Sequence, residues 1–228
     1  MSEIKVTKLT DVDLLRKANS FTTGRDSMMS LRRAYQYGHT PIRTQLFWIE
    51  MYDIPLFCGS QFVRSKIGVD WWMLTRRTDR GAEDFRVVCE GLSNDIYDII
   101  NGVYDKGMGD EPFEYHEDDD TNLGFIADEI ERLPTKFDRY APINLACLMN
   151  AEMLINMSHK RLCNKASKET REIWIKVLAK LVEVDPDLYL FCQRPCVCSG
   201  LCREPKPCGY MTTDNYKKER VSYLKLFE

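Results

Sequence analysis

A compact group of basic and amide side chains follows an apolar run in the first third of the chain and is suited to binding an anion. The run Leu46–Phe57 leads into the segment QFVRSKIG, which contains Gln61, Arg64 and Lys66. A second basic group, Thr75-Arg76-Arg77, comes shortly after it. Guanidinium groups gathered at the end of a buried element usually face an anion, and their planar forks match phosphate oxygens. The spacing therefore predicts a phosphate-binding site.

The composition limits the partners that this site could serve. The chain has 228 residues, 44% of them hydrophobic and 29% charged, which is typical of a globular protein with one substantial domain. The net charge of −3 argues against a nucleic acid polymer as partner. No apolar run is long enough to cross a membrane, and the first residues have no apolar signal core. Nine cysteines without such a signal favour reduced thiols and a cytoplasmic protein.

Hydrophobic periodicity predicts strands and helices mixed along the chain, and hence an α+β fold with a mixed sheet and flanking helices. The predicted elements are a strand and helix over 4–19, a helix over 27–37 ended by Gly38, a strand over 46–57 with Pro55 near an edge or bulge, the start of a helix over 57–66, helices over 86–103 and 124–133 around a polar loop at 104–122, a strand over 141–149, and helices over 151–165 and 168–184. We expect one domain over 1–190 and a Cys-rich C-terminal extension over 191–228 that packs on it.

Two sets of residues, in order along the chain, carry a resemblance to a known family. The first set is Gly38-His39-Thr40, the strand after it, and Gln61, Arg64, Ile67 and Arg76. The second set is Asn150, Asn156 and Arg161, and Ser20 adds an earlier match. In order and spacing these residues resemble the motifs of the flavin-dependent thymidylate synthase family. The resemblance covers most of residues 18–175.

The resemblance implies a fold and an activity. In that family FAD is reduced by NADPH, and a methylene group passes from methylenetetrahydrofolate to carbon 5 of dUMP, where a hydride completes the methyl group of dTMP. The protein mainly holds and orients its ligands, and no side-chain nucleophile is strictly required. The family forms homotetramers with active sites at subunit junctions, so a homotetramer is expected here too.

The resemblance also implies roles for individual residues. The flavin would be held by Ser20, His39, Thr40, Arg43, Arg64, Ser65, Lys66, Ile67, Asn150, Glu152 and Asn156. The pyrimidine nucleotide would be held by Gln61, Thr75, Arg76, Arg77, Arg139 and Arg161. Arg161, which would reach the pyrimidine ring, is the residue assigned to catalysis. A plainer alternative is that Asn150 and Asn156 cap or bridge backbone groups and that Arg64 and Lys66 are solvated.

Several positions depart from the family pattern. Arg-His-Arg becomes Arg64-Ser65-Lys66, so an imidazole is lost and one guanidinium fork becomes a point charge. The nucleotide-binding segment Asn-Glu-x-Ser-x-Arg becomes the run 71–76, which begins with Trp71 and Trp72. These indoles could stack on a ligand, or they could belong to a core or a subunit interface. The departures leave open dCMP or UMP as substrate, a hydroxymethyl product, or binding without catalysis.

One pair of departures suggests a compensating exchange of charge. The family has an acid where this chain has Arg43, and an arginine where this chain has Glu152. We therefore interpret Arg43 and Glu152 as partners at the flavin site whose signs have been exchanged. Chance divergence is the alternative.

The C-terminal extension has its own possible chemistry. Cys196, Cys198, Cys202 and Cys208 are close enough in sequence to supply the thiolates of a tetrahedral zinc site. Their spacing is not that of paired Cys-x-x-Cys motifs, so reduced packed thiols or an iron–sulfur cluster are alternatives. A zinc-stabilised interaction module is the functional alternative that rests on this segment alone.

Overall fold

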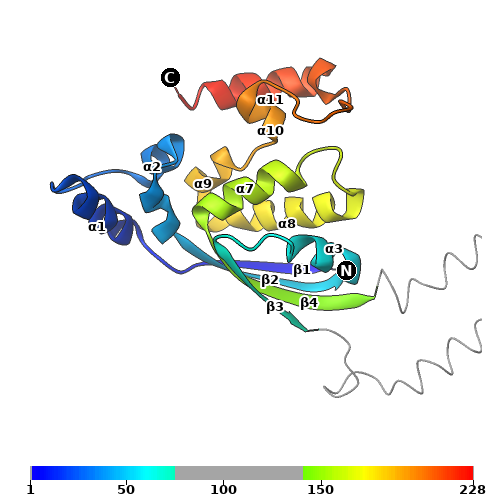
Figure 1. Ribbon diagram of the computed structural model, residues 1–228, viewed down its shortest axis with the longest axis horizontal. Coiled ribbons are helices and arrows are strands. Elements are labelled where there is room, and N and C mark those ends of the chain that lie inside the picture. Colours follow the sequence, from blue (N-terminus) through cyan, green and yellow to red (C-terminus); the bar gives the residue numbers. More distant parts are fainter. Residues whose placement is uncertain (1, 75–140, 228) are drawn as a thin grey trace, which may run out of the picture. The chain divides into compact units, whose positions relative to one another are not determined.

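The computed structural model of the chain describes residues 2–74 and 141–227 (Figure 1). The chain divides into two compact units, and the first consists of residues 1–54, 58–73 and 144–228. Of the second unit, only residues 55–57, 74 and 141–143 are described. The helices and the loop predicted between residues 86 and 133 lie outside the described residues.

The strands within the described residues form one sheet. They are β1 (Glu3–Lys8), β2 (Leu46–Pro55), β3 (Val69–Leu74) and β4 (Pro142–Asn150), in the spatial order β1-β2-β4-β3. β1 pairs antiparallel with β2. Alternate residues of β2 and β4 are buried, as expected of a sheet with one face on the core.

Helices account for most of the described residues outside the sheet. They are α1 (Val12–Thr23), α2 (Leu31–Tyr37), the 3-10 turn η1 (Thr40–Thr44), α3 (Leu56–Phe62), α7 (Ala151–Arg161), α8 (Lys168–Val184), α9 (Pro186–Phe191), α10 (Pro195–Ser199), the turn η3 (Tyr210–Thr212) and α11 (Asp214–Leu224). α7 and α8 lie on one side of the sheet, and α8 packs against β1 (Figure 1). The fully buried Trp174 of α8 contacts the ring of Phe62 at 5.9 Å between centroids.

The sequence predictions agree with much of this architecture and differ from it in one place. The helix predicted over 168–184 has those bounds, and Gly38 ends α2 in the left-handed conformation that favours glycine. Pro55 is the last residue of β2, which lies between β1 and β4, and Asp53 two residues earlier has a φ of +52°, unusual for a residue other than glycine. The predicted elements included no strand after residue 57 and before residue 141, but residues 69–74 form strand β3.

A buried carboxylate joins three elements of the core. Asp185, whose side chain is 2% exposed, accepts hydrogen bonds from Nζ of Lys8 at 2.7 Å and from the hydroxyl of Tyr35 at 2.8 Å. Its second oxygen accepts the backbone N–H of Leu188 at 2.9 Å and so caps α9. Burial, followed by the charge of Asp185, raises the pKa of Tyr35 well above its ordinary value. The carboxylate therefore connects β1, α2 and α9.

The C-terminal extension lies in the same compact unit as the sheet and its helices. Val197 of α10 is fully buried. Arg220 of α11 donates to the carbonyl oxygens of Val197 and Cys198, at 2.6 and 2.8 Å, and so joins the two helices of the extension. Among the described residues, no helix combines the length and apolar character that a membrane span would need.

Candidate functional site

The end of α7 and the end of α3 meet through Arg161 and Gln61. Arg161 donates from Nη1 to the side-chain oxygen of Gln61 at 3.3 Å, and from Nη2 to the backbone carbonyl of the same residue. Its guanidinium lies 5.5 Å from the ring centroid of Phe62. Among the described residues, Nε of Arg161 is buried without a hydrogen-bond partner. A buried N–H donor without an acceptor is costly, so this geometry suits a ligand that brings an acceptor.

A second cation intensifies the positive potential at this point. Burial and then the nearby charge of Arg64 lower the pKa of Arg161 below its ordinary value. Both causes disfavour the charged guanidinium, which nevertheless remains protonated at neutral pH. An anion bound between the two guanidinium groups would relieve the repulsion, so the pair favours phosphate or another anionic ligand.

The orientation of the Gln61 amide is fixed by its neighbours. Arginine can only donate hydrogen bonds, so the amide oxygen must be the atom that faces Arg161. The hydroxyl of Thr170, which is fully buried, donates to the same oxygen at 3.3 Å and accepts from Ser167 at 2.6 Å. The amide N–H₂ of Gln61 is thereby turned away from both partners and can donate to a ligand. Sequence analysis missed Thr170 because a lone threonine in the first turn of α8 belongs to no recognisable motif.

The loop from Arg64 to Gly68 adds further cations, and it runs from the end of α3, where Gln61 contacts Arg161, to Gly68 beside the start of α7. Ser65 is buried, and its carbonyl accepts the indole N–H of Trp71 at 2.8 Å. Arg64 and Lys66 are exposed and make no hydrogen bond or ion pair with the described residues, and Ile67 is 87% exposed. Gly68 has φ +76°, and a Cβ there would approach the side chain of Asn150 to 2.8 Å. The loop thus needs glycine where it meets α7.

The two predicted asparagines differ in their surroundings. Asn150 caps α7, because its side-chain oxygen accepts the N–H of Met153 at 2.9 Å. Its backbone N–H donates to the carbonyl of Gly68 at 3.1 Å. The side-chain oxygen and backbone N–H of Asn150 therefore have the structural roles that the plainer alternative gave them. Asn156 is exposed on α7. A helix of this length spans about 16 Å, and it separates Gly68 and Asn150 at one end from Arg161 at the other.

Arg43 and Glu152 form an ion pair, as the exchange of charge in the sequence suggested. Nε of Arg43 lies 2.6 Å from one carboxylate oxygen of Glu152, and Nη2 lies 3.1 Å from the other. The pair is bidentate and joins η1 to the first turn of α7. The flavin contact assigned to these residues stays a prediction.

We expect charge reversal to show whether this pair matters for flavin binding. Arg43→Glu and Glu152→Arg should each weaken FAD binding, because each places two like charges in contact between η1 and α7. The double variant restores opposite charges and should bind FAD better than either single variant. Titration of flavin fluorescence would measure this, with Lys176→Glu on the exposed side of α8 as a control. A double variant no better than the singles would contradict the idea.

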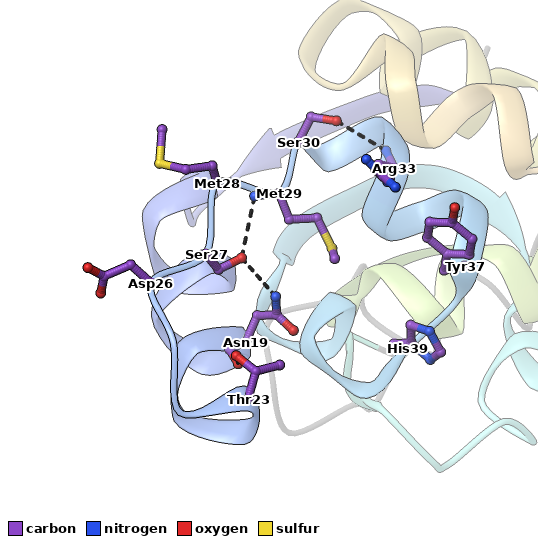
Figure 2. Close-up of a pocket in the computed structure, with 10 residues that line it drawn as sticks. All are labelled: Asn19, Thr23, Asp26, Ser27, Met28, Met29, Ser30, Arg33, Tyr37 and His39. Atoms are coloured by element: carbon purple, nitrogen blue, oxygen red, sulfur yellow. Dashed lines mark hydrogen bonds between the residues drawn. The ribbon is translucent and has the colours of Figure 1, made fainter.

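A pocket of about 590 Å³ lies between the end of α1 and α2 (Figure 2). Its lining includes His39, one of the predicted flavin ligands, and Ser27. Ser27 accepts a hydrogen bond from Asn19 at 2.7 Å, and the hydroxyl of Ser20 accepts the N–H of Ser27 at 3.0 Å. Ser20 therefore shapes the loop at the pocket rather than lining the pocket itself.

Two pocket residues that sequence analysis missed give the pocket a flat, positive wall. The rings of Tyr37 and His39 stack with centroids 5.9 Å apart, and the guanidinium of Arg33 lies 5.7 Å from the Tyr37 ring. All three are exposed. The helical spacing of Arg33 and Tyr37 beside the Gly38 turn could have indicated them. Thr40, the first residue of η1, is exposed next to this wall.

The tryptophans that replace the family's nucleotide-binding residues have protein partners. The Trp71 ring stacks on Phe62 with centroids 6.4 Å apart, and Trp72 lies 5.1 Å from Trp48. Trp71 thus packs against Phe62, whose ring the guanidinium of Arg161 contacts. The predicted nucleotide ligands Thr75, Arg76, Arg77 and Arg139 lie outside the described residues.

The cysteines of the extension do not gather as a metal site. Among the described residues, no three His, Cys, Asp or Glu side chains converge as metal ligands would. Cys196 and Cys198 both belong to α10, where residues two apart point to different sides of the helix. Cys202 is half-buried and Cys208 is exposed, and all four are free thiols. The zinc prediction therefore has no support from this geometry.

Comparison with solved structures identifies the class of fold. The chain is similar to thymidylate synthase X from Helicobacter pylori, in a structure with FAD and dUMP, at 16% identity and a TM-score of 0.50. The similarity covers 84% of this chain and 99% of that one, and it shows the fold. No protein-family model and no curated protein matches the sequence.

Proposed function

We propose that the chain is a flavin-dependent enzyme that transfers a one-carbon unit from methylenetetrahydrofolate to carbon 5 of a pyrimidine nucleotide, with dUMP as substrate and dTMP as product. The observation that carries the proposal is the meeting of Arg161 with Gln61 and Arg64, residues assigned to ligand binding that lie in a segment distant from Arg161 in sequence. The fold shared with thymidylate synthase X, whose structure contains FAD and dUMP, supports it.

The residues of the loop from Arg64 to Gly68 and of α7 fit a flavin dinucleotide. Arg64 and Lys66 offer cations that have no ion pair among the described residues for the diphosphate, the exposed Ile67 offers apolar surface for a ring, and Asn156 offers an exposed amide. Arg43 and Glu152 would contact the flavin as a neutral pair, and Ser65 would contact it through its backbone. When bound, FAD would take a hydride from NADPH and supply it to the one-carbon unit on the pyrimidine.

The nucleotide would occupy the other end of α7. Arg161 would bind the pyrimidine ring or the phosphate through its buried Nε, and Gln61 would donate its free amide N–H₂ to an acceptor on the ligand. Thr75, Arg76, Arg77 and Arg139 are further proposed ligands of the nucleotide. The pocket at His39, with Thr40 and Ser20 beside it, would hold part of the flavin against the Tyr37 wall. We further propose a cytoplasmic homotetramer.

A turnover assay tests the proposal. Protein reconstituted with FAD, NADPH and methylenetetrahydrofolate would be offered dUMP, dCMP and UMP separately, with the products identified by mass. We expect a gain of one methyl group on dUMP. A hydroxymethyl gain, or product from dCMP or UMP alone, would identify a related pyrimidine methylase or hydroxymethylase. No product from any nucleotide with flavin bound would refute the proposed reaction.

A second candidate is a protein that binds a nucleotide or flavin without catalysis. Ser65, where the family has histidine, is buried with its carbonyl held by Trp71, and Asn150 is engaged as a helix cap. Both observations favour a site that keeps its shape and has lost reacting groups. The two candidates differ in flavin reduction: an enzyme should bleach its bound flavin with NADPH, and a binding protein should not.

A further inference from the structure

We propose that Arg194, in the C-terminal extension, is a positioning residue for Arg161: the extension holds the end of α7 and so sets the direction of the Arg161 guanidinium. The inference rests on the proposed function in that Arg161 is taken as a ligand-binding residue. It assigns to the extension a role that the predicted zinc site would not have provided.

Arg194 binds the residues that directly follow Arg161. Its Nη1 donates to the carbonyl of Leu162, the residue that caps α7, and to the side-chain oxygen of Asn164 at 2.9 Å. The last carbonyl groups of a helix have no partner within the helix, and a cation beside them is favoured by the helix dipole. Arg194 therefore stabilises the turn of α7 that contains Arg161.

Arg194 is itself held by three parts of the extension. It precedes Pro195 at the start of α10, its Nε lies 3.4 Å from a carboxylate oxygen of Glu219 in α11, and its guanidinium lies 4.5 Å from the ring centroid of Tyr210 in η3. Its side chain is only 20% exposed. A planar guanidinium can serve these partners at once, because its N–H groups point outward in a rigid fork.

Arg161 needs such support because its own environment opposes its placement. Its Nε has no partner among the described residues, and Arg64 repels it. Its two hydrogen bonds within the described part of the chain both go to Gln61. A frayed last turn of α7 would let the guanidinium turn toward water, where it is better solvated. The contacts of Arg194 oppose this fraying from the far side of Leu162.

Chemical labelling of Arg161 tests the proposal without any ligand. Full-length wild type, Arg194→Ala, Arg194→Lys and the control Lys217→Ala would be treated with phenylglyoxal, and Arg161 modification would be followed by peptide mass. Lys217 is an exposed α11 residue whose ion pair is with Asp214 in the same helix. We expect Arg161 to be modified about tenfold faster in Arg194→Ala, to an intermediate degree in Arg194→Lys, and at the wild-type rate in Lys217→Ala, since a charge-assisted hydrogen bond is worth about a factor of ten.

Nucleotide binding provides the second measurement. The affinity for dUMP of the FAD-loaded protein should fall about tenfold in Arg194→Ala while its FAD affinity stays within twofold. Unchanged Arg161 labelling in a folded Arg194→Ala protein would overturn the proposal, and Arg194→Lys decides in the same way if the alanine variant does not fold. If wild type binds no pyrimidine nucleotide, the proposed function fails, whereas the labelling rates still decide whether Arg194 positions Arg161.

Discussion

Replacing Asp185 with alanine should lower the free energy of unfolding by about 3–5 kcal/mol, the loss typical when one partner of a buried ion pair is removed. The carboxylate accepts hydrogen bonds from Lys8, Tyr35 and the N–H of Leu188. Alanine leaves the ammonium of Lys8 and the hydroxyl of Tyr35 without an acceptor in the core, and it removes the cap of α9. Urea unfolding followed by circular dichroism would measure the change.

Two further variants separate the buried network from an ordinary surface effect. Glu183, near the end of α8 and just before Asp185, forms an exposed ion pair with Lys180. Glu183→Ala removes this pair and should change the free energy of unfolding by less than about 0.5 kcal/mol. Combining Asp185→Ala with Lys8→Met should cost less than the sum of the two single variants, because the uncompensated charge is then gone. An Asp185→Ala protein as stable as Glu183→Ala would show that the network contributes nothing.

The network also shows where sequence analysis reaches its limit. Asp185 before Pro186 is a recognisable start of a helix, and the structure places it there. Its partners Lys8 and Tyr35 are distant in sequence, and periodicity gives no information about such contacts. The bounds of α8 and the end of α2 at Gly38 were predictable because caps and amphipathic spacing are local.

At the candidate site, too, local features could be predicted from sequence and long-range contacts could not. The contact between Gln61 and Arg161 was suggested only by the family resemblance, since no local pattern links two such positions. Thr170 and Arg194 act through other residues, and no motif identified them. The zinc prediction has no support from the structure, because the spacing of cysteines in sequence does not fix where their sulfur atoms point once α10 forms. Strand β3 was missed because the resemblance assigned its last residues to nucleotide binding.

Arg161→Met should reduce the affinity for dUMP, and the turnover of FAD-loaded protein, by at least about 100-fold. Two charge-assisted hydrogen bonds to a ligand are together worth at least that factor. FAD affinity should stay close to wild type, because Arg161 is not among the residues proposed to hold the flavin. Calorimetric titration with dUMP and steady-state assays would measure both quantities, with the exposed neighbour Lys160→Met as the matched control.

The stability of Arg161→Met should not fall together with its affinity for dUMP. This difference separates a functional arginine from a structural one. Methionine keeps the apolar stem of the side chain against Phe62. It removes a guanidinium whose Nε is buried with no hydrogen-bond partner among residues 2–74 and 141–227 and whose charge is repelled by Arg64. The melting temperature of Arg161→Met should therefore equal or exceed that of wild type. Arg161→Lys should recover little of the dUMP affinity, because an ammonium cannot reproduce the two directed hydrogen bonds of the fork. A variant that melts several degrees lower and binds dUMP normally would make Arg161 a structural link between α7 and α3.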